Sequence, residues 1–202
     1  MQGCARPTTA HVLNGCLVAL SQDRFTYRHN QVLHYLASEL SDLIARLNTI
    51  HVYADLPGMR ASESPQGTIP PSLIVTPYHP DIVIYNETSD SVAFLELTCP
   101  LDSVYDLESA RDRKQSKEEY LHLLLSELER IGVSCCYGTM ELSVLGHYLQ
   151  SSLSSLYNTV TFFQQSISRS QCRKILDEAA GLSISASRRI LLARNCLEWT
   201  YN

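Results

Sequence analysis

The fold is decided by two short segments, Pro80-Asp81-Ile82-Val83-Ile84-Tyr85-Asn86 and Phe94-Leu95-Glu96-Leu97-Thr98. Each apolar run is long enough for a buried strand and too short for a helix. Asp81 and Glu96 therefore lie where charge is costly, and each needs a cation or hydrogen-bond donors, or else stays protonated. A divalent metal ion is the simplest partner that both acids can share.

The residues around these runs predict an α/β protein. The polar segment 86–90 predicts an antiparallel hairpin of strands at 81–86 and 91–97. Residues 49–54 predict a strand before this hairpin, and residues 133–145 contain a strand after it. Apolar residues at three- and four-residue steps predict amphipathic helices at 27–48 and at about 104–131, and residues 146–202 are helical in outline.

The helix expected at 104–131 carries two lysines on its apolar face. This face consists of Leu107, Ala110, Lys114, Lys117, Leu121, Leu124, Leu128 and Ile131. A buried ammonium group costs several kcal/mol unless it is paired. We therefore expect negative charge opposite Lys114 and Lys117, with Asp81 and Glu96 as the available partners. The alternative is that both lysines extend into solvent at the start of the helix.

Further polar residues are candidates for the same site. Arg28 and His29 lie one helical turn before buried positions, so they can reach a metal ion or a phosphate, or can serve as a cap or a solvated face. Arg111 and Arg113 concentrate positive charge near the two lysines. Glu141 is either a further metal ligand or, more simply, an acid at a strand end that faces water.

Composition sets limits on the class of protein. The chain has 202 residues, 45% of them hydrophobic, which is enough for a sizeable core in one domain. No apolar run of about 18 residues and no signal-peptide pattern occurs, so we expect an intracellular protein without a membrane span.

Seven cysteines, an odd number, favour reduced thiols over disulfides. The net charge of −5 means that any DNA contact must be local.

The N-terminal segment contains an incomplete set of zinc ligands. Cys4, His11 and Cys16 supply three ligands where a structural zinc site needs four, and Met1 occupies the position expected for the first cysteine. We therefore do not expect zinc in this chain. The segment is either a pair of buried free cysteines with a surface histidine, or a knuckle cut from a longer parent.

The order helix, strand, hairpin, helix and strand resembles the PD-(D/E)XK nuclease superfamily. Asp81, after Pro80, matches its first acid, and Glu96 matches its second. The segments 24–33, 80–83, 95–98 and 110–117 look more narrowly like the restriction-like endonuclease region at the C-terminal end of site-specific non-LTR retrotransposon polyproteins. The resemblance covers roughly residues 4–150 and implies a restriction-endonuclease-like mixed sheet of about four strands flanked by helices.

The resemblance also implies a division of the chain. Residues 1–22 would be the remnant of a Cys/His zinc-knuckle-like segment, 23–150 the endonuclease domain and 151–202 a helical C-terminal extension. In the superfamily a lysine follows the second acid by two residues, but Thr98 stands there in this chain. The retroelement enzymes take this lysine from the following helix, so Lys114 is the first match and Lys117 the second.

The chemistry that the resemblance implies is hydrolysis of DNA. Asp81, Glu96 and the backbone carbonyl of Leu97 would hold Mg²⁺ or Mn²⁺, and a lysine would orient the attacking water. Arg28, His29, Arg111 and Arg113 would contact DNA. The expected function is a metal-dependent nicking endonuclease in the nucleus, with DNA and the reverse transcriptase portion of a parent polyprotein as partners. The alternative is an inactive or repurposed fragment that binds DNA or a protein.

Overall fold

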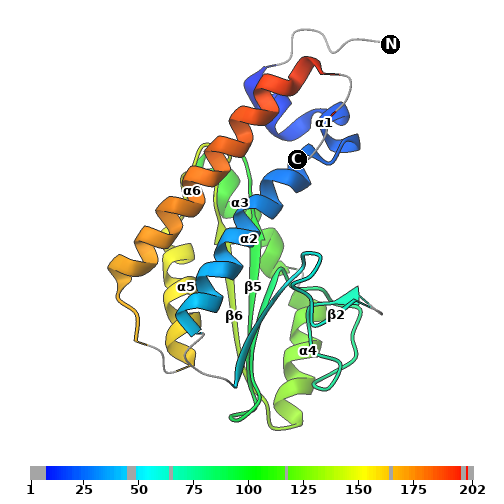
Figure 1. Ribbon diagram of the computed structural model, residues 1–202, viewed down its shortest axis with the longest axis vertical. Coiled ribbons are helices and arrows are strands. Elements are labelled where there is room, and N and C mark those ends of the chain that lie inside the picture. The colour runs from blue at the N-terminus through cyan, green and yellow to red at the C-terminus, as the bar shows by residue number, and fades with distance from the viewer. Residues whose placement is uncertain are drawn as a thin grey trace.

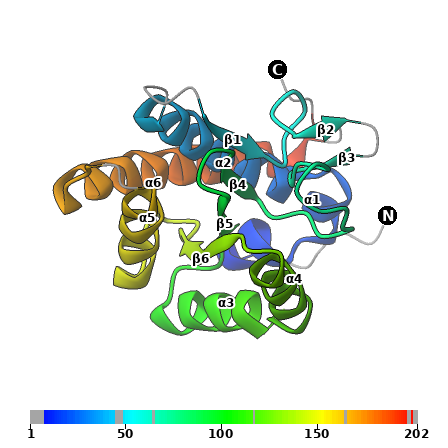
Figure 2. The same cartoon turned by 90° about the horizontal axis from the view of Figure 1, so that it is seen from below.

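A four-stranded sheet lies between two layers of helices (Figures 1 and 2). The computed structural model describes residues 8–44, 49–63, 66–116, 118–163, 166–196 and 199. The sheet has the order β1-β4-β5-β6. Its strands are β1 (Ile50–Ala54), β4 (Ile82–Asn86), β5 (Ser91–Thr98) and β6 (Ser134–Glu141). β4 is antiparallel to β1 and β5, and β5 is parallel to β6.

The helices cover both faces of this sheet. One face packs against α2 (Arg24–Ile44), α5 (Gln150–Phe162) and α6 (Arg169–Leu192), and the other lies under α3 (Val104–Ser116) and α4 (Glu118–Arg130) (Figure 2). The short elements are η1 (His11–Gly15), α1 (Leu17–Ser21), η2 (Ala193–Asn195) and the hairpin of β2 (Ser62–Glu63) and β3 (Gln66–Gly67). The predicted α/β class, with a mixed four-stranded sheet flanked by helices, is confirmed.

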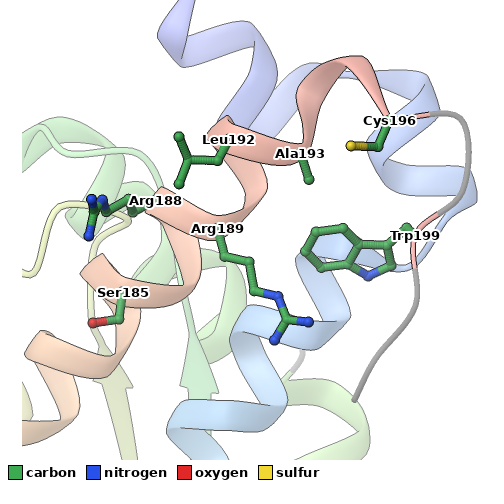
Figure 3. A pocket seen from close by; sticks show the side chains of 7 residues that line it. All are labelled: Ser185, Arg188, Arg189, Leu192, Ala193, Cys196 and Trp199. Atoms are coloured by element: carbon green, nitrogen blue, oxygen red, sulfur yellow. The ribbon is translucent and has the colours of Figure 1, made fainter.

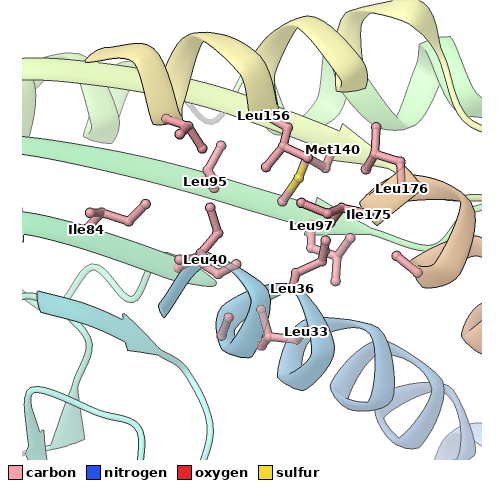
Figure 4. Packing of buried hydrophobic residues seen from close by; sticks show 14 of the residues in the cluster. Leu33, Leu36, Leu40, Ile84, Leu95, Leu97, Met140, Leu156, Ile175 and Leu176 are labelled. Carbon is pink, nitrogen blue, oxygen red and sulfur yellow. The ribbon is translucent and has the colours of Figure 1, made fainter. Parts of the chain in front are cut away.

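The central strand explains the direction of one candidate acid. Residues 91–97 of β5 are buried because helices cover both faces, which accounts for the nearly continuous apolar sequence. Side chains alternate along a strand, so Leu95 and Leu97 enter the cluster shared with α2, α5 and α6 (Figure 4). Phe94 belongs to the cluster on the opposite face. Glu96 has the same parity as Phe94 and therefore points to the face that carries α3 and α4.

Two helices differ from their predicted extents. α2 begins at Arg24, before the expected start at Tyr27, and residues 45–48 lie outside the described part of the chain. The helix expected at 104–131 corresponds to α3 and α4, and Lys117 between them lies outside the described residues. Its predicted apolar positions up to Leu128 are buried where they are described, but Ile131 is 49% exposed, so its assignment to the buried face was wrong. The helix ends there because Gly132 adopts a φ of 89°.

Gly138 allows α5 to pack closely against β6. A Cβ atom at this position would lie 2.9 Å from Ser155 Cβ and 3.1 Å from Leu95 Cδ2. We expect Gly138→Ala to lower the free energy of unfolding by about 1–3 kcal/mol, since the added methyl group overpacks this contact. Urea denaturation measures the change. Ser155→Gly in the same chain should recover part of the loss, and a Gly138→Ala variant of unchanged stability would contradict the packing argument.

Candidate active site

The hairpin of β4 and β5 brings the two candidate acids together. Asp81 lies directly before β4, and Ile82 is paired with Leu95. This register sets Asp81 beside the end of β5, where its Oδ2 atom accepts a hydrogen bond of 2.7 Å from the Leu97 amide. The Asp81 side chain is 14% exposed and the Glu96 side chain 8% exposed. Both carboxylates are thus largely removed from water.

Lys114 of α3 lies between the two acids. Its Nζ atom is 3.1 Å from Asp81 Oδ2 and also forms an ion pair with Glu96 Oε2. The Lys114 side chain is 20% exposed, so it is paired with the two carboxylates and does not extend into solvent. The structure therefore brings three of the predicted catalytic residues together. The fourth, Lys117, lies outside the described residues.

Two further side chains hold the acids in place. His29 of α2 has its Nε2 atom 3.4 Å from Asp81 Oδ1. The hydroxyl group of Tyr78 donates a hydrogen bond of 2.5 Å to Glu96 Oε1. The sequence pointed to His29 but not to Tyr78, which lies in the irregular segment before β4. The only sequence signal for Tyr78 is its closeness to the Pro80-Asp81 pair.

The two acids have opposite shifts in pKa. Burial by itself would raise the pKa of Asp81, but the hydrogen bond and charge of His29, the charge of Lys114 and the Leu97 amide together lower it. Burial and the nearby charge of Asp81 raise the pKa of Glu96, and Lys114 and Tyr78 only partly offset them. Burial opposes the charge of Lys114, but the two acids raise its pKa. Asp81 is therefore the firmly ionised acid of the pair, and Lys114 is the cation that both acids share.

The oxygen atoms at this position suit a hard divalent cation. The Lys114 ammonium group already occupies a position between Asp81 Oδ2 and Glu96 Oε2, which shows that both carboxylates can contact one cation. The Thr98 carbonyl accepts from the Leu142 amide on the β6 side. Successive carbonyls of an extended strand point to opposite edges, so the Leu97 carbonyl faces the edge where Asp81 lies. These three oxygen donors fit Mg²⁺ or Mn²⁺.

A third acid is absent from this group. Within the described ranges, no three His, Cys, Asp or Glu side chains converge on a position for a metal ion. Glu141, one candidate for a further ligand, is buried, and Ser152 Oγ donates to its Oε2 atom at 2.8 Å. The simpler expectation, that Glu141 faces water, was wrong because α5 covers this end of β6.

Two clefts meet at Lys114. One, of about 930 Å³, is lined by residues 74–79, by α4 and by Asp81, Glu96 and Lys114. The other, of about 360 Å³, is lined by Arg28 and His29 of α2, by the end of β5 and again by Lys114. The carboxylate pair therefore opens into the larger cleft, and Lys114 is reached from both.

The predicted DNA contacts have different surroundings. Arg28 is buried and donates to the carbonyls of Leu13, at 3.0 Å, and Cys99, at 3.3 Å. Its guanidinium group thus joins η1 to the end of β5, and burial lowers its pKa. Arg111 pairs with its neighbour Asp112 at 3.2 Å. Arg113, also on α3, is exposed.

The incomplete zinc set is described only in part. Cys4 lies outside the described residues, whereas His11 and Cys16 are half-buried in the N-terminal elements. His11 Nε2 is buried and has no hydrogen-bond partner within the described part of the chain.

A separate pocket lies at the C-terminal end of α6 (Figure 3). Its volume is about 470 Å³, and Arg188, Arg189 and Trp199 line it. The Arg24 guanidinium group lies 5.0 Å from the centroid of the Trp199 ring and donates to the Ala193 carbonyl at 2.7 Å. These contacts join the start of α2 to the end of α6. The pocket shares none of its lining residues with the two clefts.

We expect the contact between His29 and Asp81 to make stability depend on pH. Burial opposes the charged form of His29, but the Asp81 hydrogen bond raises its pKa. A pKa that is higher in the folded state stabilises the protein below the unfolded-state value, about 6.5, and this stabilisation is lost as the pH rises through the folded-state value. The lowered pKa of Asp81 keeps that acid ionised down to acidic pH.

His29→Gln should therefore lower the free energy of unfolding by about 1 kcal/mol near pH 5.5, and by much less near pH 8.5. Urea denaturation at the two pH values measures the difference. His34→Gln is the matched control, because His34 is exposed on the same helix. An equal loss of stability at both pH values would show that the ion pair makes no contribution.

Comparisons with known proteins give no family. No protein-family model matches the chain, and no curated protein matches it significantly. No helix within the described ranges combines the length and the apolar character needed to cross a bilayer.

Proposed function

We propose that the chain is a metal-dependent DNA endonuclease of the restriction-like type, derived from a retrotransposon polyprotein. The observation that carries this proposal is the convergence of Asp81, Glu96 and Lys114 on one cation position at the end of a hairpin. Two acids and an amine at the ends of two neighbouring strands are the groups that metal-assisted hydrolysis of a phosphodiester requires.

The strand order supports the same proposal. The helix α2, the strand β1, the hairpin of β4 and β5, the helices α3 and α4 and the strand β6 follow one another as the resemblance implies. Thr98 stands where the superfamily has its lysine, but the Lys114 amine reaches the acids from α3. This position of the amine, contributed by the following helix, supports the proposal despite the threonine at position 98.

The residues of the site have distinct tasks in this proposal. Asp81, Glu96 and the Leu97 carbonyl would hold Mg²⁺ or Mn²⁺. The bound ion supplies a polarised phosphate and a water of lowered pKa. Tyr78 fixes the orientation of Glu96 through its hydroxyl group, and His29 keeps Asp81 ionised. Lys114, released from the carboxylates, would orient the attacking water and offset the negative charge that develops on the phosphate.

A second candidate function comes from the same ion pairs. Lys114 already pairs with both acids, so the two carboxylates have a shared cation without a metal ion. This arrangement favours a repurposed fragment that keeps the fold and binds DNA or a protein without cutting. The two candidates differ in whether a divalent cation displaces Lys114.

A plasmid assay tests the proposal. Supercoiled plasmid incubated with the protein and Mg²⁺ should become nicked, whereas EDTA should prevent nicking because the two acids then have only Lys114 as their cation. Nicking that is the same in Mg²⁺ and in EDTA would point to a contaminating or metal-independent activity. Intact plasmid under both conditions would favour the non-cutting candidate.

A further inference from the structure

The larger cleft beside the acids has apolar walls that are open to water. Val75, in the irregular segment before β4, is 82% exposed, and Leu123 of α4 is 70% exposed. Both line the cleft that contains Asp81, Glu96 and Lys114. Apolar side chains that remain exposed around a candidate catalytic group indicate a binding surface for a ligand with an apolar part.

An aromatic ring joins this apolar wall to the acids. Tyr78 lines the cleft, and its hydroxyl group is fixed by Glu96 Oε1. The Tyr78 ring is therefore held next to Glu96, one of the two proposed metal ligands. Stacking on aromatic and apolar side chains is the way in which proteins hold unpaired bases, and it tolerates any base because each has a π-face. A cleft of about 930 Å³ has room for a base and its sugar.

The charged groups around the larger cleft leave its α4 side largely apolar. Among the described residues of α4 that line the cleft, Glu127 is the acid, and it is paired with Arg130 at 2.7 Å. His29 lines the smaller cleft, on the other side of Lys114. The apolar part of a nucleotide is thus favoured on the side of α4.

We propose that the apolar cleft holds an unstacked base next to the phosphate that is cut, so that the preferred substrate is DNA that is unpaired at the cutting position. This inference rests on the proposed endonuclease function. In a regular duplex the bases are paired and stacked, and a base reaches a protein pocket only after it is turned out of the helix. A substrate that is already unpaired avoids the cost of this step.

Binding to three labelled oligonucleotide substrates tests the inference. They are a regular duplex, the same duplex with a short central bubble, and the bubble with abasic sites in place of the unpaired nucleotides. Fluorescence anisotropy in Ca²⁺ measures affinity. We expect the bubble with bases to bind about tenfold more tightly than the other two. Equal affinity for the bubbles with and without bases would overturn the inference, because flexibility alone would then explain the preference.

Matched variants locate the effect. Val75→Ser and Leu123→Ser should remove most of the preference for the bubble with bases and leave binding to the regular duplex unchanged. Val104→Ser is the control, since Val104 is 65% exposed at the start of α3 and outside the cleft. An equal effect of Val104→Ser would overturn the assignment of the cleft.

Plasmid nicking, measured in parallel, keeps the two proposals distinguishable. Base-dependent binding without Mg²⁺-dependent nicking would support the cleft and contradict the endonuclease. Nicking without any preference for unpaired bases would support the endonuclease and contradict the cleft.

Discussion

Plasmid nicking in Mg²⁺ should fall by roughly a thousandfold or more when Asp81 is replaced by Asn or Glu96 by Gln. Each change removes one negative charge from the proposed ion position. The amides keep the size of the carboxyl groups and can still accept from the Leu97 amide and the Tyr78 hydroxyl group, so the fold should persist. Nicking rates, together with urea denaturation of each variant, check both expectations.

Glu87→Ala is the matched control for the two acids. Glu87 follows β4 at its other end, and its side chain is 61% exposed. This variant should nick at the rate of the unaltered protein. Full activity of both Asp81→Asn and Glu96→Gln would remove the basis of the endonuclease proposal. Loss of activity in all three variants would indicate a general effect of surface charge.

Lys114→Met should abolish nicking and lower stability in the absence of metal. Without the ammonium group, Asp81 and Glu96 are two adjacent acids with little access to water. Breaking such an ion pair costs about 2 kcal/mol in a partly exposed setting, and the cost is limited because Glu96 takes up a proton. The variant should therefore be more stable near pH 5 than near pH 7, since the raised pKa of Glu96 favours the folded state at low pH. Urea denaturation measures these differences.

The same variant tests the role of Lys114 as the resident cation. Mn²⁺ should stabilise Lys114→Met more than it stabilises the unaltered protein, because the ion no longer competes with an ammonium group. Calorimetric titration gives the affinities directly. Lys174→Met, at an 80% exposed side chain of α6, is the control and should behave as the unaltered protein. Failure of Mn²⁺ to bind Lys114→Met would favour the fragment that does not cut.

The sheet and the grouping of Asp81, Glu96 and Lys114 could be predicted from the sequence for physical reasons. β4 and β5 are buried on both faces, so their apolar runs are nearly continuous, and a single acid within such a run is conspicuous. Lys114 interrupts an apolar helical face, which required a partner of opposite charge. The periodicity of burial and the cost of an unpaired charge were together enough to relate the helix to the strands.

Other features depend on contacts that have no periodic signal. Tyr78 lies in an irregular segment, and its hydrogen bond to Glu96 follows from the path of that segment over the sheet. Glu141 is buried because α5, which comes later in the chain, covers the end of β6. The Arg28 guanidinium group donates hydrogen bonds to backbone carbonyls of two distant segments. These contacts are determined by tertiary packing, which the local pattern of apolar and polar residues does not reveal.

The β4–β5 hairpin and the helical connection from β5 to β6 also determine the order in which the groups of the site appear during synthesis of the chain. Asp81 and the Leu97 amide are 16 residues apart, whereas Asp81 and Lys114 are 33 apart. The two acids therefore emerge from the ribosome before Lys114, the cation that both of them share. Repulsion between them destabilises the isolated hairpin, and β5 gains its parallel neighbour only once β6 has been made. We expect a nascent chain that ends before α3 to remain sensitive to protease, and chains that extend beyond β6 to acquire protease resistance in a single step.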